Sequence, residues 1–292
     1  MPVIVVGNLV VGGAGKTPTV MALVQALQAA GRRPGVLSRG YGRHSKSLLE
    51  VRPDCDAAAV GDEPLLIHRR TGVPVWVGAD RVAAARALCA AHAGVDVLVS
   101  DDGLQHHALA RVAELVVFDD RGVGNGLLLP AGPLRQPLPA QPRVNAFVLY
   151  SGTCASTPLP GALATRALGL AWPLAAWWRG DGHAAVAISE LRGHTVLAAA
   201  GLAAPEKFFA MLEAAGLRLD RLPLPDHAKF DPLPWPAGLA QHVVVTEKDA
   251  VKLQPGAPGT ERVWVVPLDF TLPAELVRAL IALLPPPPPP PA

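Results

Sequence analysis

The sequence offers little that would indicate a disulfide-linked, membrane-spanning or nucleic-acid-binding protein. Its three cysteines, Cys55, Cys89 and Cys154, lie far apart and form no C-x-x-C pair, which excludes a disulfide framework or a cysteine zinc site and indicates reduced thiols. No apolar run reaches the roughly 18 residues that a membrane-spanning helix needs. The net charge of +2 gives no basis for nucleic-acid binding, and nothing in the pattern indicates a protein partner.

Hydrophobic residues make up 50% of the 292 residues, a globular composition in a chain long enough for two domains. Strands and helices alternate over the first half, as in βαβ units with a parallel sheet, and a second α/β pattern begins near residue 195. The sequence therefore predicts an α/β fold with domains at 1–190 and 191–284. The prolines of 285–292 should form an extended, disordered tail.

The most informative segment is a glycine-rich turn between the first apolar strand and the first helix. It ends in Gly15-Lys16-Thr17. Glycines let backbone N–H groups close around an anion, the helix presents its positive end, the lysine reaches the outer phosphates, and the threonine can hold Mg²⁺. The expected nucleotide-binding residues are Val10, Val11, Gly12, Gly13, Ala14, Gly15, Lys16 and Thr17. Because Val10 stands where the usual motif has its first glycine, this is a variant loop of a P-loop NTPase-like domain.

Two adjacent carboxylates, Asp101 and Asp102, close an expected strand at 95–100. Ligands bind beyond the carboxyl ends of strands in open sheets, so these side chains and Thr17 are candidate Mg²⁺ ligands. A turn or helix-capping role is the alternative. Since His106 and His107 follow, a zinc or nickel site is also conceivable, although oxygen ligands and Mg²⁺ suit a phosphate loop better.

The sequence pattern alone does not decide the roles of two further residues. Asp62 lies at another loop after a strand and could be either a general base or a helix cap, and His227 is a lone histidine of the kind that is more often structural. The segment 246–249, Thr-Glu-Lys-Asp, resembles a guanine-reading motif but carries its lysine one place too late.

Eight motifs occur in order and include Ser38-Arg-Gly-Tyr-Gly42, Gly61-Asp-Glu-Pro64, Asp101-Asp-Gly-Leu-Gln-His106, Leu129-Pro-Ala-Gly-Pro-Leu-Arg135, Pro225-Asp-His227 and Val245-Thr-Glu-Lys-Asp-Ala-Val-Lys252. Together with the phosphate loop, they closely resemble the tetraacyldisaccharide 4′-kinases, the lipid A 4′-kinases of Gram-negative bacteria. The resemblance runs from residue 3 to about residue 284.

The resemblance implies an ATP- and Mg²⁺-dependent kinase with two α/β domains joined by a hinge. Its substrate would be the 4′-hydroxyl of a tetraacylated glucosamine disaccharide 1-phosphate at the cytoplasmic face of the inner membrane. Carried over by position, Asp62 would be the catalytic base and His227 its partner, Lys16 would act on the phosphates, Asp101 and Asp102 would serve Mg²⁺, and His106 would support their loop.

Three features depart from the family pattern. The membrane helix that usually precedes the first strand is missing, so we expect peripheral attachment without that anchor. Gln136 and Ala228 stand where a glutamate and a second histidine are usual. Two other functions remain open: a SIMIBI-type ATPase or GTPase switch or metallochaperone, which would usually carry a lysine at Val11, and a kinase of small molecules.

Overall fold

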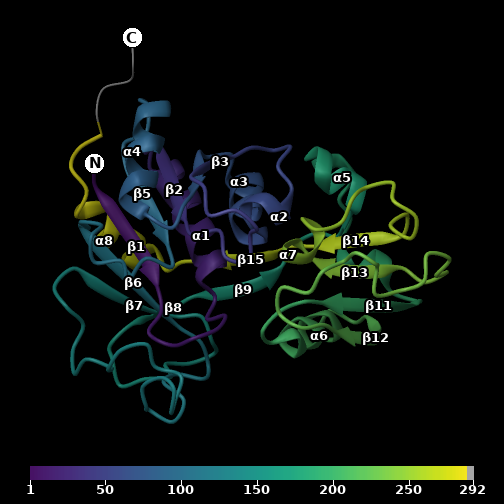
Figure 1. Ribbon diagram of the computed structural model, residues 1–292. Coiled ribbons are helices and arrows are strands. Elements are labelled where there is room, and N and C mark those ends of the chain that lie inside the picture. The colour runs from purple at the N-terminus through teal and green to yellow at the C-terminus, as the bar shows by residue number, and fades with distance from the viewer. Residues whose placement is uncertain (288–292) are drawn as a thin grey trace. The chain divides into compact units, whose positions relative to one another are not determined.

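The computed structural model describes residues 1–287, which form two compact units (Figure 1). The first unit contains Met1–Thr165 and the segment that starts at Phe270, and the second contains Arg166–Asp269. The chain therefore passes from one unit to the other twice. Two short strands stand at these crossings and pair with each other, β9 (Thr165–Leu168) and β15 (Leu268–Thr271).

The first unit is built on a mostly parallel sheet. Over the described residues its eight strands follow the order β3-β4-β2-β5-β1-β6-β7-β8, and only β3 pairs antiparallel with its neighbour. Their bounds are β1 Val3–Gly7, β2 Pro34–Ser38, β3 Leu49–Val51, β4 Val75–Val77, β5 Val97–Asp101, β6 Ala113–Phe118, β7 Ala146–Tyr150 and β8 Ala162–Leu163. The central strands are buried along their whole length, as expected when helices cover both faces of a parallel sheet.

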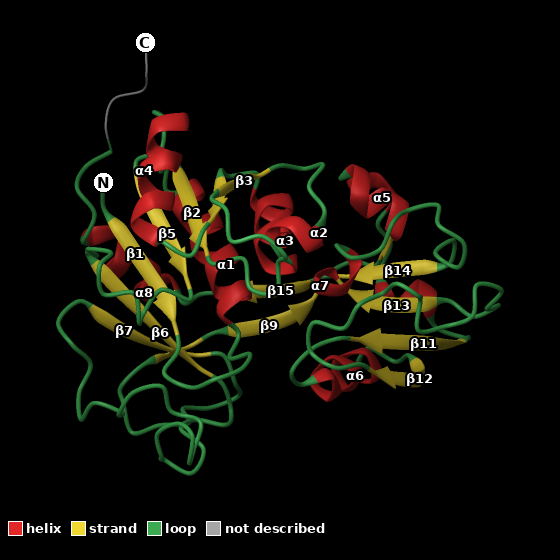
Figure 2. Ribbon diagram, viewed as in Figure 1, coloured by secondary structure: helices red, strands yellow, loops and turns green. Residues whose placement is uncertain are grey.

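Helices pack on the two faces of this sheet. On one face, Ala84 and Leu88 of α4 join a core cluster with Val3 and Val5 of β1. The opposite side carries α1, which contacts α3 and α8. The bounds are α1 Lys16–Ala29, α2 Ala57–Val60, α3 Asp62–Thr71, α4 Arg81–Ala91 and α8 Ala274–Ala282. Between β6 and β7 the chain forms loops, which Figure 2 shows in green below the sheet.

The second unit has its own sheet and core. In the part of the chain that is described, five strands follow the order β10-β14-β13-β11-β12, with β10 antiparallel. Phe208, Phe209 and Leu212 of α6 pack against Val196 and Ala198 of β11. The bounds are β10 Trp172–Pro173, α5 Leu174–Arg179, β11 Thr195–Ala200, α6 Pro205–Ala214, β12 Arg218–Pro223, β13 Val243–Thr246, α7 Glu247–Ala250 and β14 Val263–Val266.

The predicted fold class, a mostly parallel P-loop-type sheet with a second, smaller α/β unit, is confirmed. The domain boundary near residue 190 stays a prediction. The two compact units divide between Thr165 and Arg166 and again between Asp269 and Phe270. The expected proline tail at 285–292 lies outside the described residues except for its first three. Among the described residues, no helix has both the length and the hydrophobicity needed to cross a membrane.

Candidate functional site

The expected phosphate-binding residues gather at one edge of the first sheet. The phosphate loop follows β1, Asp101 ends β5, and Ser38 ends β2. These strands are neighbours and parallel, with Val6 opposite Asp101 in the register and β2 beside β5. Their carboxyl ends therefore meet at the same edge, where open α/β sheets bind ligands.

The phosphate loop is held by side chains that bind its carbonyl groups. Gly12 O accepts a hydrogen bond from Asn8 Nδ2 at 3.3 Å, Gly13 O accepts one from Arg121 Nη2 at 3.0 Å, and Ala14 O accepts one from Ser151 Oγ at 2.9 Å. In a planar trans peptide the next residue's N–H points away from the carbonyl. Three successive N–H groups are therefore turned away from these donors, as a phosphate cradle requires.

The turn into α1 depends on a glycine. Gly15 is the helix N-cap with φ 85°, a left-handed conformation that residues with a side chain rarely adopt. The helix then starts at Lys16, so its first N–H groups and its positive dipole end adjoin the loop. By contrast, Val10 and Val11 pair with the segment 133–134, and the Val11 N–H donates to Pro133 O at 2.9 Å. The phosphate-binding N–H groups should accordingly begin after Val11.

Lys16 lies in a small polar network at this edge. Its Nζ donates to Asn8 Oδ1 at 3.2 Å and lies 3.6 Å from Asp102 Oδ1. Asp102 has φ 48°, which is uncommon for a residue other than glycine, and its carboxylate also binds Arg135 Nη1 at 3.0 Å. The amine of Lys16 is thus positioned by Asn8 and Asp102, and Asp102 is itself held by Arg135.

Asn8 connects the loop to this lysine, and its removal should weaken nucleotide binding. Its side chain is fully buried and makes one hydrogen bond to the loop and one to Lys16. Losing two hydrogen bonds of about 1 kcal/mol each predicts that Asn8→Ala raises the KM for ATP about 30-fold. Steady-state kinetics would measure this. Gln28→Ala, which removes an exposed amide from α1, the helix that begins at Lys16, is the control, and equal KM values for the two variants would contradict the role assigned to Asn8.

Asp101 is a buried carboxyl with an incomplete set of partners. It is 2% exposed; Ser38 Oγ donates to its Oδ2 at 3.1 Å, while Oδ1 has no hydrogen-bond partner among the described residues. Burial, followed by the negative charges of Glu63 and Asp102, raises the pKa of Asp101 to about 7, and Lys16 opposes this shift. A buried carboxylate with one unbonded oxygen receives too few hydrogen bonds from the protein to stabilise its charge, and a bound cation would stabilise it.

This environment predicts that Asp101 destabilises the fold at neutral pH. Because its folded-state pKa lies above the unfolded value of 3.8, the stability that protonation provides is complete below that value and is lost as the pH rises through about 7. The advantage of Asp101→Asn over the wild type in unfolding free energy should therefore grow by on the order of 2 kcal/mol between about pH 5, where only part of that stability is lost, and about pH 8. Urea unfolding without nucleotide or metal would show this. The same difference at both pH values would contradict the explanation.

The donor set fits Mg²⁺ better than a transition metal. Among residues 1–287, no three His, Cys, Asp or Glu side chains are grouped so that they could hold a metal ion by themselves. The zinc or nickel alternative thus finds no support in the described part of the chain. Mg²⁺ usually takes one or two carboxylates together with substrate phosphates and water, and the unpartnered oxygen of Asp101 and the hydroxyl of Thr17 are ligands of that kind.

Asp62 starts α3, directly after a strained glycine. Gly61 has φ 97°, and a Cβ there would lie 3.2 Å from the Cα of Gly40, so only glycine lets the turn after β2 approach the helix. Asp62 is 7% exposed and its Oδ1 accepts the Glu63 N–H at 2.9 Å. Since the charge of Glu63 acts on Asp101, the start of α3 belongs to the same sheet edge as the phosphate loop.

His227 belongs to the second unit, and its pairing with Asp62 stays a prediction. The residue has φ 59°, and its N–H donates to Asp226 Oδ1 at 3.1 Å. Lys248 Nζ donates to the same Asp226 oxygen at 2.9 Å and lies 3.5 Å from His227 Nε2. The histidine therefore stands beside a lysine and an aspartate, a cluster that the sequence did not indicate.

Asp249 shows why the guanine-like segment has another role. Its carboxylate is fully buried and accepts hydrogen bonds from Gly201 N at 3.1 Å and Thr246 Oγ1 at 2.7 Å. These bonds connect the carboxyl ends of β11 and β13. Asp249 is therefore engaged within the second sheet, whereas Lys248 of the same segment lies beside His227.

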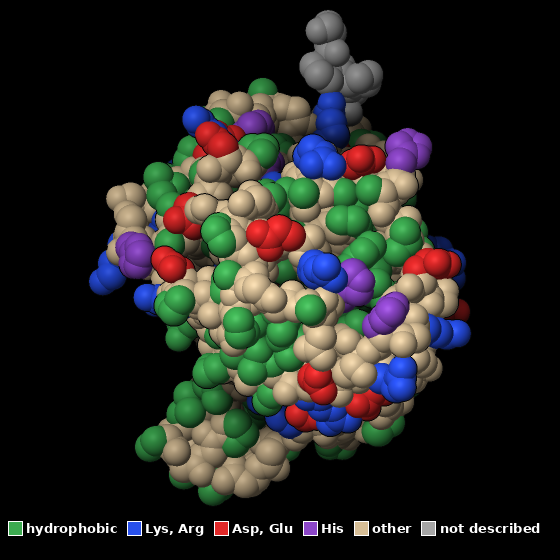
Figure 3. All heavy atoms as spheres, turned by 90° about the vertical axis from the view of Figure 1, so that its right-hand side faces the viewer, with side chains coloured by type: hydrophobic (Ala, Val, Ile, Leu, Met, Phe, Trp, Pro, Cys, Tyr) green, Lys and Arg blue, Asp and Glu red, His purple; other side chains and the backbone are tan. Residues whose placement is uncertain are grey.

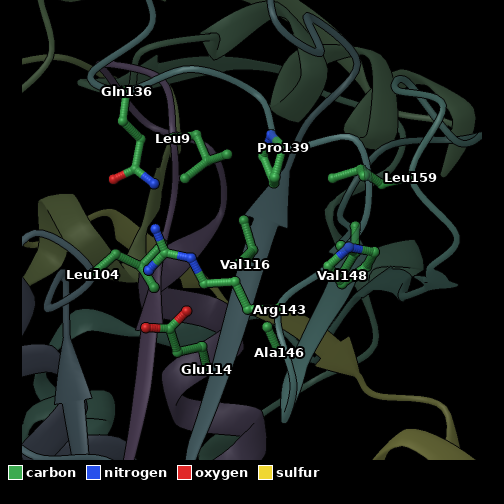
Figure 4. Close-up of a pocket in the computed structure, with 11 residues that line it drawn as sticks. Leu9, Leu104, Glu114, Val116, Gln136, Pro139, Arg143, Ala146, Val148 and Leu159 are labelled. Atoms are coloured by element: carbon green, nitrogen blue, oxygen red, sulfur yellow. The ribbon is translucent and has the colours of Figure 1, made fainter.

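A small pocket of about 30 Å³ lies beside the phosphate loop in the first unit. Leu9, Leu104, Val116 and other apolar side chains line it, and Figure 4 shows Arg143 reaching across it between Gln136 and Glu114. The pocket is mainly apolar and contains none of the predicted catalytic residues.

Sequence reasoning assigned no role to several residues that shape the site. Arg135 binds Asp102, Ser38 binds Asp101, and Ser151 and Arg121 bind the phosphate loop. All four lie far along the chain from their partners. The one available signal was that Ser38 and Arg135 fall within the motifs that carried the family resemblance.

Comparisons with known proteins point to one family. The family model described as tetraacyldisaccharide-1-P 4′-kinase matches residues 1–285. A protein named tetraacyldisaccharide 4′-kinase from Leptothrix cholodnii is 55% identical over 98% of this chain and 83% of its own length. A protein of the same name from Methylibium petroleiphilum is 56% identical over 92% of this chain and 76% of its own length.

A solved structure agrees with the sequence relatives. The crystal structure of LpxK from Aquifex aeolicus in complex with ATP is similar with a TM-score of 0.76 and 27% identity. The similarity covers 97% of this chain and 89% of that one. The family model matches nearly the whole chain, and the relatives are more than half identical to it. The chain therefore belongs to the tetraacyldisaccharide 4′-kinase family.

Proposed function

We propose that this kinase transfers the terminal phosphate of ATP to the 4′-hydroxyl of a tetraacylated glucosamine disaccharide 1-phosphate. The single observation that carries the proposal is the phosphate loop with Lys16 above it, next to two carboxylates at the end of β5. The names of the relatives supply the acceptor, and the Aquifex structure, which is an ATP complex, supplies the donor.

The nucleotide phosphates are bound by the loop and the start of α1. The N–H groups between Gly12 and Thr17 face the phosphates, and the helix dipole favours their negative charge. Lys16 reaches the outer phosphates and neutralises the charge that develops during transfer. Asn8 and Asp102 hold the Lys16 amine in this position before substrate arrives.

Thr17, Asp101 and Asp102 would hold Mg²⁺. When bound, the ion neutralises phosphate charge and aligns the terminal group. Asp101 is suited to this because one of its oxygens has no partner among the described residues. The ion pair of Asp102 with Arg135 keeps that second carboxylate oriented toward the same edge.

Asp62 is proposed as the general base. As the acceptor oxygen attacks the terminal phosphorus, the bond from that phosphorus to the bridging oxygen of ADP breaks, and the hydroxyl proton passes to the carboxylate. Alignment provides most of the rate in phosphoryl transfer, so a buried and oriented carboxylate is sufficient. His227, held by Asp226 beside Lys248, is proposed as its partner from the second unit.

The acyl chains of the acceptor place the reaction at a membrane surface. An acceptor with four acyl chains stays in the bilayer because each buried CH₂ group contributes about 0.8 kcal/mol. We therefore infer peripheral association with the cytoplasmic face of the inner membrane, where ATP is available.

Acceptor-dependent ADP formation tests the proposed function against the switch ATPase. The purified protein would be given ATP, Mg²⁺ and the disaccharide 1-phosphate in detergent micelles, with its 4′-deoxy analogue as control. A kinase forms ADP at a rate that depends on the natural acceptor and falls to background with the analogue. If ADP forms as fast without any acceptor as with the natural one, the protein is an ATPase and the proposal is rejected.

A further inference from the structure

Asp226, His227 and Lys248 form a cluster at one edge of the second sheet. Asp226 and His227 lie in the loop after β12, and Lys248 lies in α7 directly after β13 (Figure 1). Both strands run parallel to β11, which lies between them in the sheet. Their carboxyl ends therefore meet at the same edge, which brings a histidine and a lysine that are 21 positions apart close together.

One carboxylate oxygen holds both the backbone of the histidine and the amine of the lysine. Asp226 Oδ1 accepts the His227 N–H at 3.1 Å and a hydrogen bond from Lys248 Nζ at 2.9 Å. His227 has φ 59°, a left-handed conformation that a residue with a side chain adopts only where its surroundings fix it. The imidazole therefore extends from a fixed backbone, and the lysine amine lies 3.5 Å from its Nε2.

Lys248 is the most buried member of the cluster. Its side chain is 15% exposed, compared with 28% for His227 and 31% for Asp226. Figure 3 shows the more usual situation, because on the face that it draws the acidic and basic side chains of the described residues are scattered, with neither sign gathered into one extended patch. Exposed ion pairs contribute little. Lys248 is largely enclosed and bonded to Asp226, so its amine is held beside the ring.

The lysine determines which ring nitrogen of His227 carries the proton. An ammonium group has three N–H donors and no acceptor, so the nitrogen that faces it has to be the acceptor. A neutral imidazole carries one proton, and with Nε2 as the acceptor that proton lies on Nδ1. A doubly protonated ring would point an N–H at the ammonium, and two donors cannot form a hydrogen bond with each other.

The carboxylate of the cluster does not reverse this assignment. Asp226 Oδ1 lies 3.9 Å from His227 Nε2, which is beyond hydrogen-bond distance. The same oxygen already accepts hydrogen bonds from the His227 amide and from Lys248. Asp226 thus binds the lysine and not the ring, and so it orients the donor that faces Nε2.

We propose that Lys248, held by Asp226, is a positioning residue that keeps His227 as the neutral tautomer with its proton on Nδ1. The inference rests on the proposed function, in which His227 is the partner of Asp62. A histidine of this tautomer donates from Nδ1 to a carboxylate, and such a bond orients the carboxylate and stabilises its charge. Lys248 thus acts on the reaction through His227.

NMR on the full chain measures the protonation of the two ring nitrogens. At about pH 8, where an unperturbed histidine is neutral, long-range proton–nitrogen spectra should show a protonated Nδ1 and an unprotonated Nε2 for His227. The signals are identified by their absence from His227→Ala. A proton on Nε2 in the wild type would overturn the proposal, and this result depends on no variant that has to fold.

Two substitutions of Lys248 test whether the lysine is the cause. Lys248→Met has a side chain of similar length without a donor, and it frees Asp226 to accept an N–H from the ring. In this variant the proton should move to Nε2 in most molecules. Lys248→Arg retains a donor and should keep the tautomer of the wild type. An unchanged tautomer in Lys248→Met would overturn the proposal.

Kinase kinetics measure the effect of the lysine on the reaction. Lys248→Met should lower kcat about tenfold or more and leave the KM for ATP within about twofold, since a histidine of the wrong tautomer cannot support the base. In the His227→Ala background the same substitution should cause no further loss, because Lys248 acts only through His227. Lys229→Met removes an exposed lysine two positions after His227 and is the matched control, which should keep the wild-type kcat.

The two readouts separate this inference from the proposed function. If the tautomer responds to Lys248→Met as expected but the wild type transfers no phosphate to the acceptor, the proposed function fails while the lysine still sets the tautomer. If Lys248→Met raises the KM for ATP or acceptor and the tautomer stays as in the wild type, the lysine binds a phosphate group and the proposal is overturned. Equal losses of kcat with and without His227 would overturn it as well.

Discussion

Lys16→Ala should lower kcat by about 10²- to 10³-fold, the range typical for loss of one charge-stabilising group at a reaction centre. The amine is the positive side chain held directly over the phosphate loop, by Asn8 at 3.2 Å and by Asp102 at 3.6 Å. Charge on the transferred phosphoryl group increases in the transition state, so the loss should fall mainly on kcat.

A matched control is available for this variant. Lys46→Ala removes an exposed lysine from a loop of the same unit and should leave kcat within about twofold of the wild type. Initial rates of ADP formation with saturating acceptor would provide both values. If Lys16→Ala retained more than a tenth of wild-type kcat, the loop would not be the site of transfer.

The second large effect concerns Asp62 and His227 and should appear as non-additivity. Asp62→Asn and His227→Ala should each lower kcat by about 10²- to 10³-fold, since proton transfer by a positioned group contributes about that much. If the two residues act as one dyad, the double variant should be no slower than the slower single variant. ATP affinity should change far less than kcat in each case.

The outcome that would contradict the dyad is multiplication of the two single effects, which is the behaviour of independent residues. His194→Ala removes an exposed histidine from the second unit and controls for general loss of imidazole groups. Comparable loss of ATP affinity and of kcat in His227→Ala would also exclude a role confined to the proton transfer step.

The sequence predicted those parts of the site that are encoded by adjacent residues. The loop from Gly12 to Thr17 combines a strand, glycines and a helix start within a short segment, and each has a local signal. Asp101 and Asp102 were placed correctly at the end of a strand because buried parallel strands are continuous apolar runs. The observed helix begins at Lys16, within the motif itself, because phosphate-loop residues form its first turn.

Features that depend on distant residues could not be predicted from local pattern. Arg135 and Asp102 are 33 positions apart and Lys248 and His227 are 21 apart, and no periodicity links them. The contact of α8 with α1 could not be predicted either, because the sequence of α8 indicates only an amphipathic helix and not the element that it packs against. The short elements β3 and α2 were missed because three or four residues carry too weak a signal.

The position of the transferred phosphate tests the central claim most directly. The claim is that the phosphate loop presents the terminal phosphate of ATP to a sugar hydroxyl beside Asp62. After reaction of the disaccharide 1-phosphate with ATP, phosphorus–proton correlation by NMR should show one new phosphate coupled to H-4′, absent with Lys16→Ala. A product without phosphate at the 4′-position, or phosphate transferred equally well by Lys16→Ala, would contradict the claim.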